Sequence, residues 1–345
     1  MMRKLLSLLV ALAMLLTMTA CAGAPEAVET APETSVSASA YPMTLTDQAG
    51  RQVTIAAEPQ RLISAYYITT SALMALGLGD RLVGIENDAA KRPIYSLSAP
   101  ELLELPSVGT VKELDVEGCL ALEPDLLILP MKLKDMVPIL EGFGLTVLLV
   151  EPENQQLLTE MICLIAAATQ QEARGESLVD FLQTQEDFLM ETMAQVEKPR
   201  VYLGGNSSFL STAPSGMYQS DLIRLAGGEN VAGEIEDTYW VKIDYEQLLR
   251  WDPEYIILAS AAGYTVEDVL SDPALASCSA VENRRVYQIP NQAEAWDSPV
   301  PGGILGALWL ANVLHPQVLT DADCAQRIST FYETFYDFAY ETNET

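Results

Sequence analysis

The first regular pattern along the chain is an alternation of apolar and polar residues from Tyr41 to Ile55, with Gly50 inside it. This period of two around a glycine predicts a β-hairpin. Aliphatic runs with little polar alternation follow, separated by stretches of helical period. Such runs are typical of strands buried on both faces, as in a parallel sheet covered by helices. The expected strands of this part are residues 61–66, 81–85, 125–130 and 145–150, and the expected helices are residues 69–76, 116–122 and 134–143.

The pattern changes in the middle of the chain and then starts again. From Asn154 to about Val196 the period is helical without strands, and residues 170–196 contain no proline and one glycine. At 1.5 Å per residue, about 26 residues of helix reach roughly 39 Å, which is enough to bridge two lobes. Beyond Pro199 the alternation returns, with strands expected at residues 200–205, 255–260 and 285–290 and helices at residues 218–226, 245–250, 303–314 and 322–338.

The predicted fold class is therefore α/β, with two lobes and one long helix between them. A chain of this length is long for one core and sufficient for two. We expect an N-terminal lobe at residues 41–169, a bridging helix at residues 170–198 and a C-terminal lobe at residues 199–345.

One pattern occurs twice, about 129 residues apart. The segments LDVEGCLALEPDLLILP (114–130) and IDYEQLLRWDPEYIILA (243–259) both contain a glutamate, then a proline flanked by acids seven residues on, then an aliphatic run. Each glutamate, Glu117 or Glu246, lies near the start of a short predicted helix, so the two can occupy equivalent rims of the two lobes. An acid in the first turn of a helix is favoured by about 0.3–1 kcal/mol in any case. That preference explains either glutamate alone but not their pairing.

The N-terminus has the features of an export signal at residues 1–21. Arg3 and Lys4 precede an apolar run, residues 5–16, that is too short to span a bilayer as a mature helix. In LTMTACAG a small residue stands directly before Cys21, which resembles the lipobox of bacterial lipoproteins; an ordinary secretory peptide is the alternative. Residues 22–40 are mainly Ala, Pro, Glu, Thr, Ser and Val, so we expect a disordered tether and a protein lipid-anchored at Cys21 on the outer face of the cell membrane.

Charge and cysteine content narrow the function classes. The net charge of −29 becomes −31 once Arg3 and Lys4 leave with the signal, which argues against nucleic acid or an anionic membrane face as a partner. The cysteines other than Cys21 show no C-x-x-C spacing and do not form a disulfide framework, although pairing among them stays open: Cys119, Cys163, Cys278 and Cys324. The single histidine, His315, stands at a predicted helix end and cannot build a site for bare zinc or manganese.

Seven segments, in order, resemble the helical-backbone (class III) substrate-binding proteins of ABC importers for iron-siderophores, haem and corrinoids. They are TLTDQAGRQVTIAAEPQRLIS, ALGLGDRLVGI, SVGTVKELDVEGCLALEPDLLIL, LIRLAGGENVAG, IDYEQLLRWDPEYIIL, NRRVYQIP and GILGALWLANVLHP, and the resemblance covers Met43 to Pro316. It implies two Rossmann-like lobes with parallel-rich sheets, joined by one long helix, with a ligand in the cleft and only small closure. It also implies a monomeric transport protein without a cofactor, in which Glu117 and Glu246 match the acids that dock onto arginines of the transmembrane dimer.

Candidate ligand-binding residues follow from the rule that ligands of open α/β lobes collect at the carboxyl ends of the strands. Aromatic side chains there suit a planar or bulky chelate because they offer rigid contact area. About half of these positions are expected to be packing anchors instead. The strand-end candidates are Tyr66, Tyr67, Asn87, Asp88, Met131, Lys132, Asn206, Ser207, Trp296 and Asp297, and Trp240 stands where the resembled family often places a ligand-contacting residue.

No enzyme motif is present: the chain has no G-x-S-x-G, no H-E-x-x-H and no G-x-x-x-x-G-K-[ST]. A carboxylate-dependent hydrolase and an adhesion lipoprotein stay as alternatives, which a ligand found in the cleft would exclude.

Few cations lie near the expected cleft, which favours a neutral or cationic complex: Lys112, Lys132, Lys242 and Arg92. The expected ligand is an iron chelate first, a corrinoid or haem second, and an oxyanion such as molybdate third, because WDSPVPGGILGALWL is also similar to family members that carry oxyanions.

Overall fold

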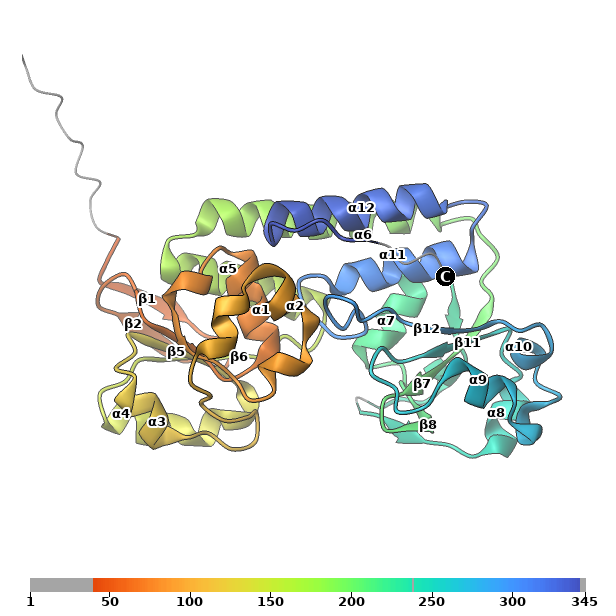
Figure 1. Ribbon diagram of the computed structural model, residues 1–345, viewed down its shortest axis with the longest axis horizontal. Helices are drawn as coiled ribbons and strands as arrows, with labels where there is room; N and C mark the ends of the chain where they lie inside the picture. The colour runs from red at the N-terminus through yellow and green to blue at the C-terminus, as the bar shows by residue number, and fades with distance from the viewer. Residues whose placement is uncertain (1–39, 238, 342–345) are drawn as a thin grey trace, which may run out of the picture. The chain divides into compact units, whose positions relative to one another are not determined.

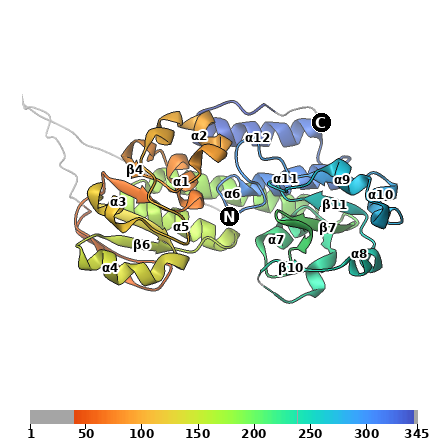
Figure 2. The ribbon, with the colours of Figure 1, turned by 60° about the horizontal axis from the view of Figure 1, so that its bottom comes forward.

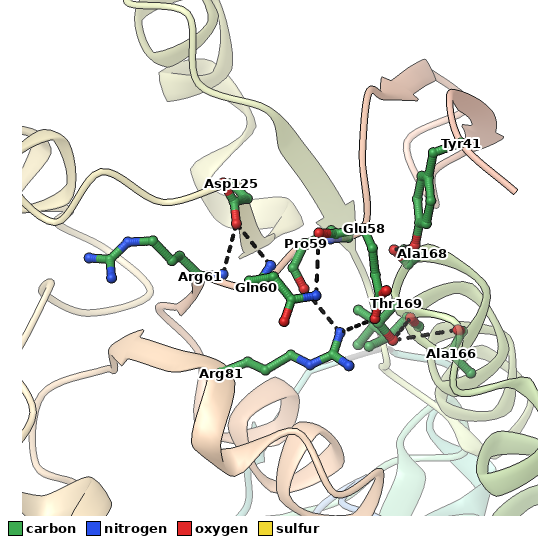
Figure 3. A network of polar contacts seen from close by, with 11 residues as sticks. Tyr41, Glu58, Pro59, Gln60, Arg61, Arg81, Asp125, Ala166, Ala168 and Thr169 are labelled. Atoms are coloured by element: carbon green, nitrogen blue, oxygen red, sulfur yellow. Dashed lines mark hydrogen bonds and ion pairs between the residues drawn. The ribbon is translucent and has the colours of Figure 1, made fainter. Parts of the chain in front are cut away.

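The computed structural model of the chain describes residues 40–237 and 239–341, and its first elements are two short strands, β1 (Met43–Thr46) and β2 (Gln52–Ile55). They pair antiparallel with Met43 opposite Ile55, which confirms the predicted hairpin. The hydroxyl of Tyr41 donates to the carbonyl of Ala168 over 2.9 Å and so attaches the start of the hairpin to a later helix (Figure 3). The expected signal at residues 1–21 and the tether up to residue 39 lie outside the described residues.

The first sheet is parallel throughout, as predicted. Its strand order is β4 (Leu82–Gly84), β3 (Leu62–Ser64), β5 (Leu126–Pro130) and β6 (Val147–Val150). Ile128 and Leu148 pack into the cluster that holds α1 (Tyr67–Ala75), whereas Leu127 and Leu149 pack into the cluster that holds α3 (Val116–Ala121) and α4 (Val137–Gly142). Both faces of the sheet are therefore buried, which is why its strands read as aliphatic runs. A further helix, α2 (Pro93–Ser98), was not predicted.

The middle of the chain forms two helices that meet near residue 170, where the expected bridging helix starts. α5 (Gln155–Thr169) ends where Gln170 adopts a left-handed conformation with φ of 56°, and α6 (Glu172–Thr192) begins after it. The 21 residues of α6 reach about 32 Å at 1.5 Å per residue, somewhat less than the predicted bridge. A Cβ on Gly175 would lie 2.6 Å from the Cβ of Ala166, so the glycine allows α5 and α6 to pack closely.

The helix α6 connects the lobes through its packing. It contacts α5 of the first lobe and both α7 (Tyr218–Leu225) and α11 (Gly303–Leu314) of the second. α12 (Asp321–Phe335) lies beside α6 and α11 in Figure 1, and Arg327 donates to Gln185 of α6 over 2.7 Å. Arg174 of α6 donates to Ala75 at the end of α1 over 2.6 Å, so the long helix is fixed to elements from both halves of the chain.

The second sheet is parallel at its centre and antiparallel at one edge. Its order is β10 (Val241–Lys242), β8 (Ser208–Thr212), β7 (Arg200–Gly205), β11 (Tyr255–Leu258) and β12 (Val286–Gln288), and β9 (Glu229–Asn230) also pairs with β7. β8 runs antiparallel to both β7 and β10. The sequence patterns missed β8 and β10. The helices α8 (Tyr245–Trp251), α9 (Val266–Leu270) and α10 (Ser279–Glu282) cover one face (Figure 2).

One apolar cluster runs through both lobes and the helices between them. It contains Leu62 and Leu73 of the first lobe, Leu182 of α6, and Leu203 and Leu308 of the second lobe. Of the helices in the described part of the chain, none combines the length and apolar character that a membrane crossing requires.

The cysteines of the described residues are all free. His315 is buried at the C-terminal end of α11, where its Nε2 lies 3.1 Å from the carbonyl of Gly227.

Candidate functional site

A cavity of about 670 Å³ lies between the two lobes, at the carboxyl ends of the strands of the first sheet. The segments that line it follow β3, β5 and β6 in the first lobe. In the second lobe they form the start of α7 or precede β10 and α11. The lining side chains used below are Tyr66, Tyr67, Met131, Lys132, Lys134, Glu151, Glu153, Asn154, Met217, Tyr218, Gln219, Tyr239 and Trp240. We refer to this cavity as the cleft.

Two tyrosines form one wall of the cleft at the start of α1. Tyr66 is the residue before the helix, in an extended conformation, and Tyr67 is its first residue. Their rings meet edge to face with centroids 5.3 Å apart. Burial raises the pKa of both phenols above the usual value of 10.0, so both stay neutral at physiological pH. This wall therefore offers aromatic surface and phenol hydroxyl groups, without a charge.

The charged residues of the cleft come from the first lobe and are of both signs. Lys132 and Lys134 lie in the 3₁₀ turn Met131–Met136 that follows β5 directly. Glu151 and Glu153 follow the end of β6, the strand next to β5. Two ammonium groups and two carboxyl groups thus share the cleft, which suits a ligand with both donor and acceptor groups better than a bare ion of high charge.

The opposite wall contains Trp240, which is placed by the short edge strand that follows it. Val241 and Lys242 pair with Thr212 and Ser211 of β8. A Cβ on Gly205 would lie 2.7 Å from Cζ3 of the indole ring of Trp240, so the ring packs against the backbone of β7 where only glycine leaves room. Tyr239, beside it, is 70% exposed and lies at the mouth of the cleft.

The structure brings five of the eleven predicted ligand-binding residues together in the cleft: Tyr66, Tyr67, Met131, Lys132 and Trp240. Their role in binding stays a prediction.

The other six do not line the cleft: Asn87, Asp88, Asn206, Ser207, Trp296 and Asp297. Trp296, Asn87 and Asn206 are engaged elsewhere. Trp296 is 1% exposed, and its Nε1 donates to the hydroxyl of Tyr332 over 2.8 Å, so it is a packing anchor beneath α12. The side-chain oxygen of Asn87 accepts from the hydroxyl of Ser107. That of Asn206 accepts from the N–H of Ala261 over 3.1 Å, in the turn between β7 and β8.

Several residues of the cleft were not predicted. Glu151, Glu153 and Asn154 follow β6, and the strand-end rule applied to that strand would have found them. Residues 216–219 and Tyr239 carry no such signal, because they follow antiparallel strands or a loop. Among the described residues, the hydroxyl of Tyr218 and Oε1 of Gln219 are buried without a hydrogen-bond partner.

The segments that carry the repeated sequence pattern also fold alike. Asp115 and Asp244 are the N-caps of α3 and α8, and their side chains accept from the N–H of Gly118 over 2.9 Å and of Gln247 over 2.7 Å. Glu117 and Glu246 are exposed in the first turns.

At the other end of each short helix, the acid before the proline is left-handed, with φ of 45° at Glu123 and 41° at Asp252. An arginine at the start of a neighbouring strand donates a hydrogen bond to this end of each helix. Arg61 donates to the carbonyl of Leu122 over 2.6 Å, and Arg200 donates to that of Asp252 over 3.2 Å.

The acid after each proline accepts backbone N–H groups at the start of the neighbouring strand. Asp125 accepts from Gln60 over 2.8 Å and from Arg61 over 2.9 Å (Figure 3), and Glu254 accepts from Arg200 over 3.1 Å. Each helix runs back along the strand that follows it, so its N-terminus lies at the carboxyl edge of its sheet, and Figure 1 shows α3 and α8 at the lower side of their lobes. The repeat is therefore the same structural motif in both lobes, and each copy exposes a glutamate at the rim of its lobe.

In residues 40–237 and 239–341, no three His, Cys, Asp or Glu side chains come close enough to hold a metal ion.

Comparison with known proteins agrees with this architecture. The molybdate-binding protein MolA of Haemophilus influenzae is 25% identical over 324 residues, which are 86% of this chain and 92% of MolA. The structure of MolA bound to molybdate matches with a TM-score of 0.77 and 24% identity, over 87% of this chain and 99% of that one. A cobalamin-binding protein of Halobacterium salinarum is 25% identical over 324 residues, 89% of this chain and 84% of that protein.

A further solved structure, Helicobacter pylori CeuE with Ni(II) bound, has a TM-score of 0.75 and 21% identity, over 86% of this chain and 97% of that one. The sequence profile described as Periplasmic binding protein matches residues 62–293. With two lobes, a long connecting helix and a cleft between the lobes, the chain belongs to this family of substrate-binding proteins, which deliver small ligands to ABC importers.

Proposed function

We propose that the cleft captures a metal chelate, of the iron-siderophore class, and that the protein delivers it to the permease of an ABC importer. The observation that carries this proposal is the size of the cleft together with its aromatic walls. At roughly 30 Å³ per water molecule, 670 Å³ corresponds to about 22 waters, within the range of cavities that hold drug-sized ligands. Tyr66, Tyr67 and Trp240 supply the flat surface on which a chelate packs.

The charges of the cleft support a complex that keeps its own metal ligands. Lys132 and Lys134 are balanced by Glu151 and Glu153, so the cleft has no large excess of either sign. A chelate that presents acceptor oxygens on one side and donor groups on the other can satisfy both pairs.

A second candidate is a molybdate-type oxyanion, because MolA is similar over most of both chains. Against it, a tetrahedral anion fills only a small part of the cleft, and it would need the two glutamates to face away. A corrinoid is a third candidate, on the similarity to the cobalamin-binding protein.

The test is the ligand that the protein carries. Protein purified from its own host should show the visible absorption bands of a chelate and the corresponding added native mass. Ferric siderophores, cobalamin and sodium molybdate are then titrated into the emptied protein while tryptophan emission is recorded. A coloured chelate in the cleft should quench emission in the wild type and in Trp309→Phe, whose ring lies on α11 away from the cleft lining, but much less in Trp240→Phe. If the protein binds molybdate and none of the other compounds, the ligand is an oxyanion and not a chelate. If it binds none of them, the proposal is refuted.

We also propose that Glu117 and Glu246 dock onto cations of the permease dimer. Both glutamates are exposed, both follow an aspartate N-cap, and each lies at the rim of its own lobe. A partner built of two equivalent halves presents two equivalent sites, one for each glutamate.

The third proposal is a lipid anchor at Cys21, which rests on the sequence of residues 1–40. About 19 tether residues, taken as a flexible coil, would hold the lobes roughly 20–30 Å from the lipid, on the outer face of the membrane.

A further inference from the structure

A second cavity, of about 160 Å³, shares Tyr67 with the cleft. Its walls come from both lobes. The first lobe contributes Ser71 of α1 and residues 91–95, and the second contributes Ser260 and residues 291–295. The N–H of Ile94 donates to the carbonyl of Ala293 over 3.0 Å, so the backbones of the two lobes meet at this cavity.

The group without a partner in this cavity is the guanidinium of Arg92. It lies over the ring of Tyr67, with Cζ 3.6 Å from the ring centroid. Its Nε is buried and has no hydrogen-bond partner, and within residues 40–237 and 239–341 neither a hydrogen bond from its side chain nor an ion pair of Arg92 is found. Stacking on the ring occupies one face of the guanidinium and leaves its edge of N–H donors free.

The carboxyl groups near Arg92 are satisfied by hydroxyl groups instead. Glu294 accepts from Ser71, and from Tyr336 over 3.1 Å. Glu86 accepts from Thr70 over 2.6 Å and from Tyr95. Burial raises the pKa of both carboxyl groups, that of Glu294 to about 7, while the charge of Arg92 opposes the rise at Glu86. Neither carboxyl group forms an ion pair with Arg92 in the described residues.

The other polar groups of the cavity are also engaged. The hydroxyl of Ser260 donates to Asp297, and the side-chain amide of Asn291 donates to the carbonyl of Ser260 over 2.8 Å. Lys91 forms an ion pair with Asp88 over 3.0 Å, and its side chain is 75% exposed. Arg92 is thus a cation with free donors at a small cavity whose own acceptors are occupied.

We propose that this second cavity binds a single carboxylate or phosphate group through the free edge of Arg92. The guanidinium edge matches both groups with two parallel N–H···O bonds. At about 30 Å³ per water, the cavity has the volume of roughly five waters, which fits such a group but not a chelate. The anion is either an arm of the ligand in the cleft, reaching past Tyr67, or a separate small ion. In the first case the site rests on the proposed function of the cleft; in the second it is independent of the ligand there.

The experiment is calorimetric titration of formate, acetate and inorganic phosphate into the full-length protein at low ionic strength. We expect saturable binding of one anion per protein. Arg92→Gln should weaken it roughly 10- to 100-fold, as for loss of a hydrogen bond to a charged group. Arg250→Gln removes the same charge from an exposed position on α8, outside the cavity, and should change the affinity less than about twofold. Arg92→Lys keeps the charge but loses the paired N–H donors of the guanidinium, so its affinity for the anion should lie between those of the other two variants. Thermal melts of all three variants verify the fold.

Two further measurements distinguish the two possible sources of the anion. If it is an arm of the cleft ligand, Arg92→Gln also weakens binding of that ligand, and a filled cleft prevents phosphate or acetate from binding. If it is a separate ion, both bind together, and Trp240→Phe weakens only the cleft ligand. An equal loss in Arg250→Gln and Arg92→Gln, or no saturable binding of any of the three anions by the wild type, would overturn the proposal.

Discussion

Glu294 offers a direct test of the buried polar network between the lobes. The carboxyl group is 4% exposed, and burial raises its pKa from 4.5 to about 7. The folded protein therefore keeps a proton on Glu294 that the unfolded chain releases above about pH 4.5. The contribution of this group to the free energy of unfolding is fully present below that pH and is lost as the pH rises to about 7. A shift of about 2.5 units corresponds to roughly 3.4 kcal/mol, at 1.36 kcal/mol per unit.

Replacing Glu294 by Gln removes this titration while keeping the shape of the side chain. Raising the pH from 4.5 to 8 lowers the free energy of unfolding of the wild type. For Glu294→Gln this decrease should be smaller by roughly 3 kcal/mol. For a folded part of about 300 residues, the decrease in Tm over the same pH range should be about 5 °C smaller in Glu294→Gln than in the wild type. Burial also raises the pKa of Glu86 and Asp297, and their contribution, which has the same sign, is common to both proteins.

The assay is urea unfolding followed by fluorescence at pH 5, 6, 7 and 8. Glu333→Gln, at an exposed position of α12, is the matched control, and its pH profile should follow that of the wild type. If Glu294→Gln and the wild type lose the same free energy between pH 5 and 8, the carboxyl group titrates normally, and the assignment of a buried, protonated Glu294 is wrong.

Three further predictions concern the rim, the cleft and the N-terminus. The double variant Glu117→Ala, Glu246→Ala should keep ligand affinity within about twofold and the Tm of the wild type but sharply reduce uptake; normal uptake would show the repeat to be a folding device only. Gly205→Ala places a Cβ against the ring of Trp240 and should weaken the cleft ligand at least several-fold in titrations, while an unchanged affinity would mean that the ring makes no contact with the ligand. Cys21→Ser should move the protein from the membrane to the soluble fraction, and retention in the membrane would contradict the lipid anchor.

The sequence patterns predicted the parallel parts of the fold well because burial on both faces produces uninterrupted aliphatic runs. The first sheet and the helix at residues 303–314 were found in this way. The strands β8 and β10 were missed because one is only two residues long and the other, SFLST, is partly polar. The break at Gln170 coincides with the expected start of the bridging helix, although a glutamine in the left-handed conformation has neither the glycine nor the proline that usually marks a helix end.

Apart from Trp240, which the family resemblance supplied, the residues of the cleft were predicted where they follow a parallel strand. Met131 and Lys132 follow β5 without a gap, and both line the cleft. Trp296 stands eight residues beyond the end of β12, and the path of that loop under α12 depends on tertiary packing. Arg92 was expected only as one of the few cations near the cleft. That its Nε has no hydrogen-bond partner among the described residues depends on how the two lobes pack, which the sequence pattern of neither segment predicts.

The apolar cluster shared by both lobes has a consequence for how the protein unfolds. Since leucines of the first lobe, of α6 and of the second lobe belong to one continuous cluster, separating the lobes exposes the same core that holds each of them together. We expect the lobes to melt in one cooperative transition, instead of two. A ligand bound to one lobe would then protect backbone amides from hydrogen exchange in the other, because global opening is the common route to exchange for both.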